Sequence, residues 1–268
     1  MTKTISAAVN PALANNLIQQ AMAETKPEQS EVKIIPPSDN VVTLPGGYIN
    51  AAGEVITEAE VRELTGADEE AIAKASDVGR ALLIILQRGT VRIGEEKATE
   101  KILDQLLSGD RDTLLLAIFK ATFGHSTEVP VFFGNELKQV EVDLDKEIKF
   151  KVLVDSINDR VFTVKGRKHE YTVQLPTGVA QKEMILNSDK TSAELTTIML
   201  ENTVMQIDGS PVLTKQQVRN LGLVDRKAIV DEINSRIPGP QFDDITVEDP
   251  DTGKEVLVPV NFGTLFRF

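Results

Sequence analysis

Hydrophobic residues recur at helical spacing in several blocks of the chain after residue 40. Apolar side chains three or four positions apart indicate helices with one buried face. These blocks predict helices over residues 65–75, 77–91, 96–108, 109–124, 192–207, 214–222 and 223–239. Thr65 with Asp68, and Thr214 with Gln217, form capping patterns at two helix starts, and Gly124 supplies a stop.

Other segments alternate between apolar and polar residues, which is typical of half-buried strands. Alternation predicts strands over 41–50 and 54–64, and a hairpin of 128–133 with 136–144 around Gly134-Asn135. In the middle of the chain, 146–178 should form three short strands broken at Asn158-Asp159 and Gly166. A last hairpin is expected from 243–249 and 254–260 around the turn "PDTG".

Residues 1–40 have a different pattern. Pro11 followed by Leu13, Leu17, Ile18 and Met22 predicts a short amphipathic helix, and a stretch rich in Pro and charge follows it. Two interpretations stay open for this N-terminal arm. It is a disordered terminus, or it is an arm that becomes ordered against a partner protein.

The two halves of the chain repeat one another. Asp110-Arg111 recurs 115 residues later as Asp225-Arg226, each followed by a helical block and a valine-rich strand pair. The other matches are "EVPV" with "DITV", "KQVEVDL" with "KEVLVPV", "TVRI" with "TVMQI", and "LPGG" with "LPTG". A period above about 50 residues indicates duplicated domains and not a solenoid. The sequence therefore predicts an α+β fold of two tandem, internally duplicated domains, 41–146 and 147–268, after an extended arm over 1–40. Each domain should run from β-strands to helices to a closing β-hairpin.

Composition narrows the possible classes of function. Of 268 residues, 41 are acidic and 29 basic, and the net charge of −12 argues against a nucleic-acid partner. Zero cysteines exclude thiolate zinc sites and thiol nucleophiles. The longest apolar runs, such as Ala81–Leu86, are far shorter than the roughly 20 residues of a membrane helix. The N-terminus has no apolar signal core, so the sequence predicts a protein that stays in solution and is not exported by a standard signal.

Candidate chemistry is sparse. His125 and His169, the two histidines, have no Ser or Asp constellation at a recognisable spacing. Asp110 and Asp225 lie at predicted helix starts, where capping explains them. An acidic cluster near the C-terminus comprises Asp243, Asp244, Glu248, Asp249 and Asp251. Its composition is compatible with calcium binding, but it lacks the spacing and the glycine of an EF-hand loop. We therefore predict no catalytic, cofactor-binding or metal-binding residue and no cofactor.

Strands around "LP-G", a helical block with "DR" and a closing hairpin, all in tandem, resemble the baseplate hub and hub-assembly family of contractile-tailed bacteriophages of the T-even type. The resemblance covers residues 41–268. Many members carry a Cys-Pro-x-Cys-Gly knuckle in each closing hairpin. This chain has Asp249 and Thr252, and Val129 and Phe132, in those places. The resemblance then implies hairpins that are held by packing without zinc.

The resemblance implies a structural component of the phage tail baseplate or hub, which acts through protein contacts during tail assembly. Its partners would be other tail proteins, in several copies, with no nucleic acid and no membrane. It would reside in the virion tail, and in the host cytoplasm during assembly. A non-virion assembly chaperone is the alternative within the family. A hydrolase or metal-dependent enzyme is the alternative from another class.

Overall fold

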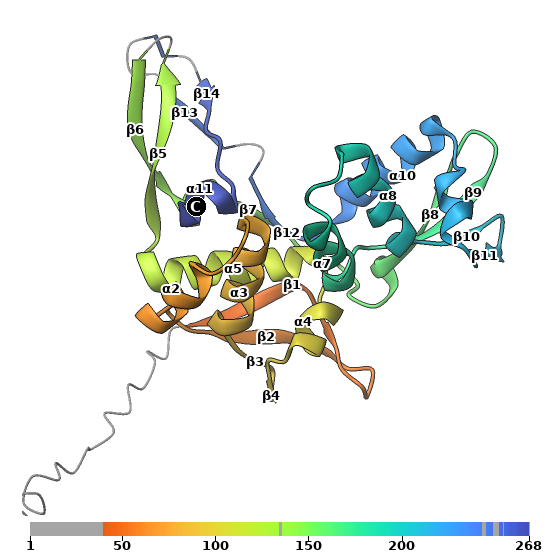
Figure 1. Ribbon diagram of the computed structural model, residues 1–268, viewed down its shortest axis with the longest axis horizontal. Coiled ribbons are helices and arrows are strands. Elements are labelled where there is room, and N and C mark those ends of the chain that lie inside the picture. The colour runs from red at the N-terminus through yellow and green to blue at the C-terminus, as the bar shows by residue number, and fades with distance from the viewer. Residues whose placement is uncertain (1–39, 134–135, 243–244, 249–251, 254, 268) are drawn as a thin grey trace, which may run out of the picture. The chain divides into compact units, whose positions relative to one another are not determined.

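The structure is a computed structural model that describes residues 40–267 except 134–135, 243–244, 249–251 and 254 (Figure 1). The arm predicted for residues 1–40 lies outside the described residues, apart from Asn40. The described chain mixes helices and strands, as the predicted α+β class requires.

The first part of the fold, from β1 to α5, is called here the N-terminal half. It places two strands, two helices, two strands and two helices in order. These are β1 (Val41–Ile49), β2 (Val55–Val61), α2 (Gly66–Ile72), α3 (Val78–Gly89), β3 (Thr90–Ile93), β4 (Glu96–Lys97), α4 (Glu100–Gln105) and α5 (Ser108–Phe123). The four strands form one antiparallel sheet in the order β1-β2-β3-β4.

Local sequence explains these boundaries. Thr65 and Asp68 form the predicted capping box before α2. Asp77 caps α3 by accepting a hydrogen bond from the Arg80 amide at 2.9 Å. The predicted stop of α5 at Gly124 is confirmed, since that residue has a φ of 96° that favours glycine. Apolar side chains from sheet and helices then share one core, which includes Leu44, Ala59, Ile85, Ile93 and Leu114.

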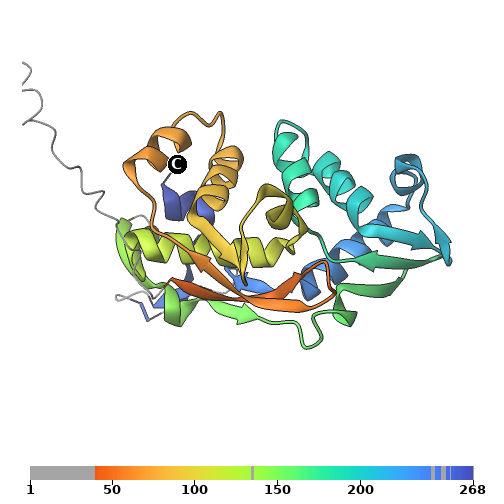
Figure 2. The same cartoon turned by 90° about the horizontal axis from the view of Figure 1, so that it is seen from below.

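The later part, from β8 to α10, is called the C-terminal half. Its elements are β8 (Val161–Lys165), β9 (Glu170–Gln174), α7 (Gly178–Leu186), α8 (Ser192–Thr203), β10 (Val204–Ile207), β11 (Ser210–Pro211), α9 (Lys215–Arg219) and α10 (Leu223–Arg236). The strands pair in the order β8-β9-β10-β11, and a second core forms around Tyr171, Val173, Leu200 and Ile229. In Figure 2 the helices α2, α3, α7 and α8 lie on the same side of the strands.

The remaining elements form two hairpins and short connecting pieces. They are β5 (Ser126–Phe133), β6 (Glu136–Asp143), α6 (Leu144–Glu147), β7 (Lys149–Lys151), the 3-10 turn η2 (Asn158–Arg160), β12 (Gly239–Gln241), β13 (Thr246–Glu248), β14 (Glu255–Leu257) and α11 (Phe262–Phe266). Both predicted closing hairpins are present, as β5–β6 and β13–β14. They pack on α5 and α11 in a third core that includes Leu116, Phe119, Val129 and Val258. We call the two hairpins with α11 the hairpin body (Figure 1).

Several predictions need correction. The helix predicted over 192–207 ends at Thr203, because the next four residues pair with β9 as strand β10. Helices α7 and α11 and the small strands β4, β11 and β12 were not anticipated. "LPGG" lies inside β1, whereas "LPTG" follows β9 and enters α7, so matching these two motifs was wrong. By position in the element order, Thr65-Gly66 corresponds to Thr177-Gly178.

The two halves contact one another through backbone as well as side chains. Leu107, between α4 and α5, forms an isolated antiparallel bridge with Thr177. The Ser108 amide donates to the Pro176 carbonyl at 2.9 Å, and the Gly178 amide donates to the Leu106 carbonyl at 2.8 Å. This contact joins the corner between α4 and α5 to the junction between β9 and α7.

Candidate protein interaction site

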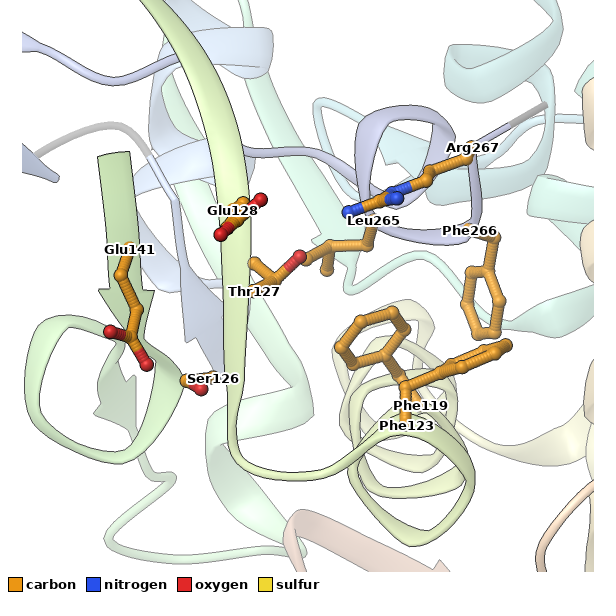
Figure 3. Close-up of a pocket in the computed structure, with 9 residues that line it drawn as sticks. All are labelled: Phe119, Phe123, Ser126, Thr127, Glu128, Glu141, Leu265, Phe266 and Arg267. Atoms are coloured by element: carbon orange, nitrogen blue, oxygen red, sulfur yellow. The ribbon is translucent and has the colours of Figure 1, made fainter. Parts of the chain in front are cut away.

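A groove of about 470 Å³ opens in the hairpin body, between the end of α5, the start of β5 and the helix α11 (Figure 3). It brings together residues that lie far apart in the sequence. The lining residues are Phe119, Phe123, Ser126, Thr127, Glu128, Glu141, Leu265, Phe266 and Arg267.

Three aromatic rings form the apolar side of the groove. Phe119 and Phe123 lie one turn apart on α5, which places them on the same helix face, and their ring centroids are 5.1 Å apart. Phe266 meets Phe119 edge to face at 5.4 Å. Phe119 is 3% exposed, whereas Phe123 is 59% exposed and presents its ring to solvent. In Figure 3 the carboxylates of Glu128 and Glu141 lie across the groove from these rings.

The outer face of the β5–β6 hairpin is also apolar near its tip. Side chains of β5 alternate strictly between buried and exposed, so Val131 and Phe133 point into the core. Phe132 points outward with 66% exposure, and its cross-strand partner Leu137 is 55% exposed. Leu257 on β14 is 60% exposed. Within the part of the chain that the structure describes, no third strand joins either hairpin. Exposed apolar side chains beside open strand edges are typical of surfaces that bind other proteins.

Phe119 should stabilise the fold, whereas Phe123 should contribute mainly to the exposed surface, and two substitutions test this difference. Phe123→Ser should change the free energy of unfolding by less than about 1 kcal/mol, because most of this ring is already in water. Phe119→Ala should cost about 3–5 kcal/mol, because it leaves a cavity in the third core. Urea denaturation of both variants measures the difference. Equal losses would mean that the Phe123 ring belongs to the core.

The histidines each contact one carboxylate near the surface. His125 Nδ1 lies 2.7 Å from Asp145 Oδ2, and His169 Nδ1 lies 2.6 Å from Asp208 Oδ2. Their side chains are 70% and 47% exposed. Neither makes a hydrogen bond to a Ser, Thr or Tyr hydroxyl of a described residue, so no acyl-transfer constellation is assembled there.

The remaining candidate chemistry is metal binding. Over the described residues, no group of three or more His, Cys, Asp or Glu side chains is placed to hold a metal ion. Of the acidic cluster only Glu248, in β13, is described, and Asp243, Asp244, Asp249 and Asp251 lie outside the described residues. No described helix has the length and apolar content to cross a membrane.

The two Asp-Arg pairs differ from their prediction. Neither Asp caps its own helix: α5 begins after Leu107 and α10 after Gly222, without a side-chain cap. Asp110 Oδ1 accepts a hydrogen bond from the Gly46 amide at 2.7 Å, and Asp225 Oδ1 accepts one from the Arg167 amide at 2.6 Å. Asp110 therefore ties α5 to β1, and Asp225 ties α10 to the turn between β8 and β9.

The electrostatic environments of the two carboxylates are opposite. Burial raises the pKa of Asp110 to about 7, although the Gly46 amide and the Arg160 guanidinium favour the charged form. The pKa of Asp225 is lowered, first by the Tyr171 hydroxyl, which donates to Oδ2 at 2.6 Å, and then by the Arg167 amide. Asp110 is fully buried, whereas Asp225 lines a pocket of about 790 Å³ together with Tyr171 and His169.

The arginines that follow also serve packing. Arg111 is 2% exposed and donates to the Leu103 carbonyl at 3.3 Å. Arg226 donates to the Thr197 hydroxyl of α8 at 2.8 Å. The sequence could not identify these partners, because they come from other elements.

Comparison of the chain with protein-family models, with curated proteins and with solved structures finds no match. The contacts described above are therefore the basis for a functional proposal.

Proposed function

We propose that this chain is a structural component of a bacteriophage tail baseplate or hub, built from one module that occurs twice. It acts by protein–protein contact during tail assembly. The observation that carries the proposal is the repeated order of elements, with the Asp-Arg pair of the resemblance at equivalent helix starts. The "LP-G" motifs do not lie at equivalent positions and add no support.

Both halves run strand, strand, helix, helix, strand, strand, helix, helix, and their sheets have the same internal strand order. Backbone conformation agrees at equivalent helix starts. Thr65 and Thr177, before α2 and α7, have φ of −112° and −103°. Leu107 and Gly222, before α5 and α10, have φ of −63° and −62° and ψ of 151° and 145°. An Asp recurs at the third position of α5 and α10, and each accepts a hydrogen bond from a backbone amide in the strand region of its own half. These agreements support a duplicated module.

The first closing hairpin is not arranged as a zinc knuckle. Val129 and Phe132 stand where the resemblance would place two metal-binding cysteines, yet Val129 is buried in the third core and Phe132 is 66% exposed. Side chains on opposite faces of a strand cannot share one tetrahedral site. In this chain, apolar packing on α5 stabilises both hairpins, whereas zinc would stabilise them in members with the knuckles.

Exposed apolar side chains on the hairpin body support a role in protein–protein contact. The aromatic groove, the Phe132–Leu137 pair and Leu257 expose apolar side chains on one body. Such surfaces are typical of proteins that are covered by partners in an assembly. The partners we propose are other tail proteins.

The test is the protein content of purified mature phage particles, measured by mass spectrometry. We expect the chain in the tail fraction, and a Phe132→Asp/Leu137→Asp variant should be incorporated at a reduced level while remaining folded. Presence in assembly intermediates with absence from mature particles would instead support the assembly chaperone. Absence from both would overturn the proposal.

A further inference from the structure

The contact between the two halves has an unoccupied counterpart on the same chain. Inside the chain, the corner between α4 and α5 (106–108) binds the junction between β9 and α7 (176–178) by two backbone hydrogen bonds. By position in the repeated order, the corner between α9 and α10 (221–223) corresponds to the first surface. The junction between β2 and α2 (64–66) corresponds to the second. The α9–α10 corner lies in the C-terminal half and the β2–α2 junction in the N-terminal half. In the described part of the chain, neither forms a backbone bridge to the other half.

Both counterparts are open to solvent. Leu107 is 2% exposed, whereas Leu223 and Val224, at the free corner, are 83% and 61% exposed. Gly178 is buried, whereas Gly66 is exposed and a Cβ placed there would meet no atom of the described residues within 4 Å. Among the described residues, no hydrogen-bond acceptor is paired with the amides of Leu223 and Gly66. These are the donors that correspond to the Ser108 and Gly178 amides.

Side-chain pairs flank the occupied contact. Lys182 of α7 forms ion pairs with Glu100, and with Asp104 at 3.2 Å, both on α4. Gln181 donates to Asp112 of α5 at 3.1 Å. The receiving surface is therefore basic or neutral, and the corner that enters it is acidic.

At the two free surfaces the charges are opposite to those of the occupied contact: the junction is acidic and the corner is basic. Counting from Gly66 as from Gly178, the positions of Gln181 and Lys182 hold Glu69 and Glu70, both exposed. The positions of Glu100, Asp104 and Asp112 hold Lys215, Arg219 and Lys227, whose side chains are 61%, 57% and 76% exposed. Each of these cations also forms an ion pair within its own chain, with Glu183, Glu201 or Asp231, and these pairs would have to be shared with the incoming carboxylates. A basic corner thus matches an acidic junction. The basic free corner would be repelled by the basic β9–α7 junction, and the acidic free junction by the acidic α4–α5 corner. The free corner and the free junction have opposite charges, which favours their binding to each other.

We propose that a second copy of this chain docks head to tail, with its β2–α2 junction on the α9–α10 corner of the first copy. Leu223 N–H would donate to the Leu64 carbonyl of the next copy, and Gly66 N–H to the Leu221 carbonyl. Glu70 would face Arg219 and Lys215. This inference rests on the duplicated module of the proposed function. Because the two surfaces differ, the contact is heterologous and extends into a closed ring or an open chain of copies.

One part of the internal contact is not copied. A Cβ on Gly109 would lie 1.5 Å from the Pro238 carbonyl oxygen, so the internal corner is closely covered there. The equivalent position at the free corner is Val224, which needs more room. The contact between copies is therefore the backbone bridge with its flanking ion pairs, and it should be weaker than the internal one.

Two single substitutions test the direction of docking. Gly66→Arg blocks the junction and Leu223→Asp blocks the corner, and both sites are exposed enough for the fold to survive, which circular dichroism checks. In sedimentation velocity up to about 1 mM, the wild-type chain should form oligomers and each variant alone should stay monomeric. A mixture of the two variants should form a one-to-one dimer, because one intact corner and one intact junction remain. A monomeric wild-type chain, association of either variant alone, or a mixture without dimer would overturn the proposal.

A charge exchange tests the assigned pair. Glu70→Arg should weaken association at least tenfold, and adding Arg219→Glu in the same chain should restore most of it. Continued weakness of the double variant would overturn the assignment. These measurements use the isolated protein, so they are independent of particle content. A chain that is present in particles but monomeric refutes only this inference, and a self-associating chain that is absent from particles refutes only the proposed function.

Discussion

Gly178→Ala is expected to destabilise the protein by about 2–4 kcal/mol. A Cβ at this position would lie 2.0 Å from the Arg111 guanidinium, 2.5 Å from the Leu103 carbonyl oxygen and 2.8 Å from the Asp104 Cα. Two of these neighbours are backbone atoms that cannot move without disturbing α4. The third belongs to a guanidinium that is almost completely buried between the halves. The close approach of α7 to α4 and Arg111 therefore requires glycine.

The equivalent position in the N-terminal half provides the matched control. Gly66→Ala introduces the same methyl group at the first residue of α2, where no atom from the described part of the chain lies within 4 Å of it. We expect this variant to be unchanged or stabilised by up to about 1 kcal/mol, since alanine lowers the entropy of the unfolded chain. Urea unfolding of the two variants gives the comparison. Similar stabilities would show that α7 can move away from Arg111 at little cost.

Elements with one clear apolar face were predictable from the sequence. The helix α3, the stop of α5 at Gly124 and the β5–β6 hairpin all follow local patterns that tertiary contacts reinforce. Capping boxes at Thr65 and Thr214 were also visible, because both partners lie three residues apart. In these cases the information that decides the structure lies within a few residues.

The failures have a different origin. Helix α7 packs on α3, α4 and α8, so its apolar residues do not form a single stripe and the helical period is hidden. Residues Val204–Ile207 continue the spacing of α8, and only pairing with β9 makes them a strand. Tertiary contact overrides local preference in both segments.

The candidate site shows the same limit. Phe119 and Phe123 could be placed on one helix face from their spacing, but Phe266 joins them from the other end of the chain. Asp110 could be placed at a helix start, but its hydrogen bond to Gly46 spans 64 residues. Sequence periodicity describes single elements, whereas the groove and the carboxylate contacts arise between elements.

The buried carboxyl of Asp110 should make the protein less stable as the pH rises. Its side chain is fully buried, and burial raises the pKa from 3.8 to about 7. The folded protein therefore binds a proton between these pH values that the unfolded chain has already released. Stability from this group is complete below about pH 3.8 and is lost as the pH rises through about 7. The loss amounts to about 4 kcal/mol.

Asp110→Asn should remove this dependence, since an amide stays neutral and its oxygen can still accept from the Gly46 amide. Relative to the wild type, the free energy of unfolding of the variant should increase from pH 4 to 7 and then stay constant. Denaturant unfolding at several pH values measures it.

Asp225→Asn is the opposite control at the equivalent position. The pKa of Asp225 is lowered by the Tyr171 hydroxyl and the Arg167 amide, so its charged form stabilises the fold above the unfolded pKa, and this contribution is lost as the pH falls. This variant should therefore lose stability at neutral pH and approach the wild type in acid. Parallel pH profiles for the two Asn variants would contradict the environments assigned to both carboxylates. Opposite slopes would show that two equivalent positions hold a hairpin by opposite electrostatics, one through a neutral buried acid and one through a charged acceptor.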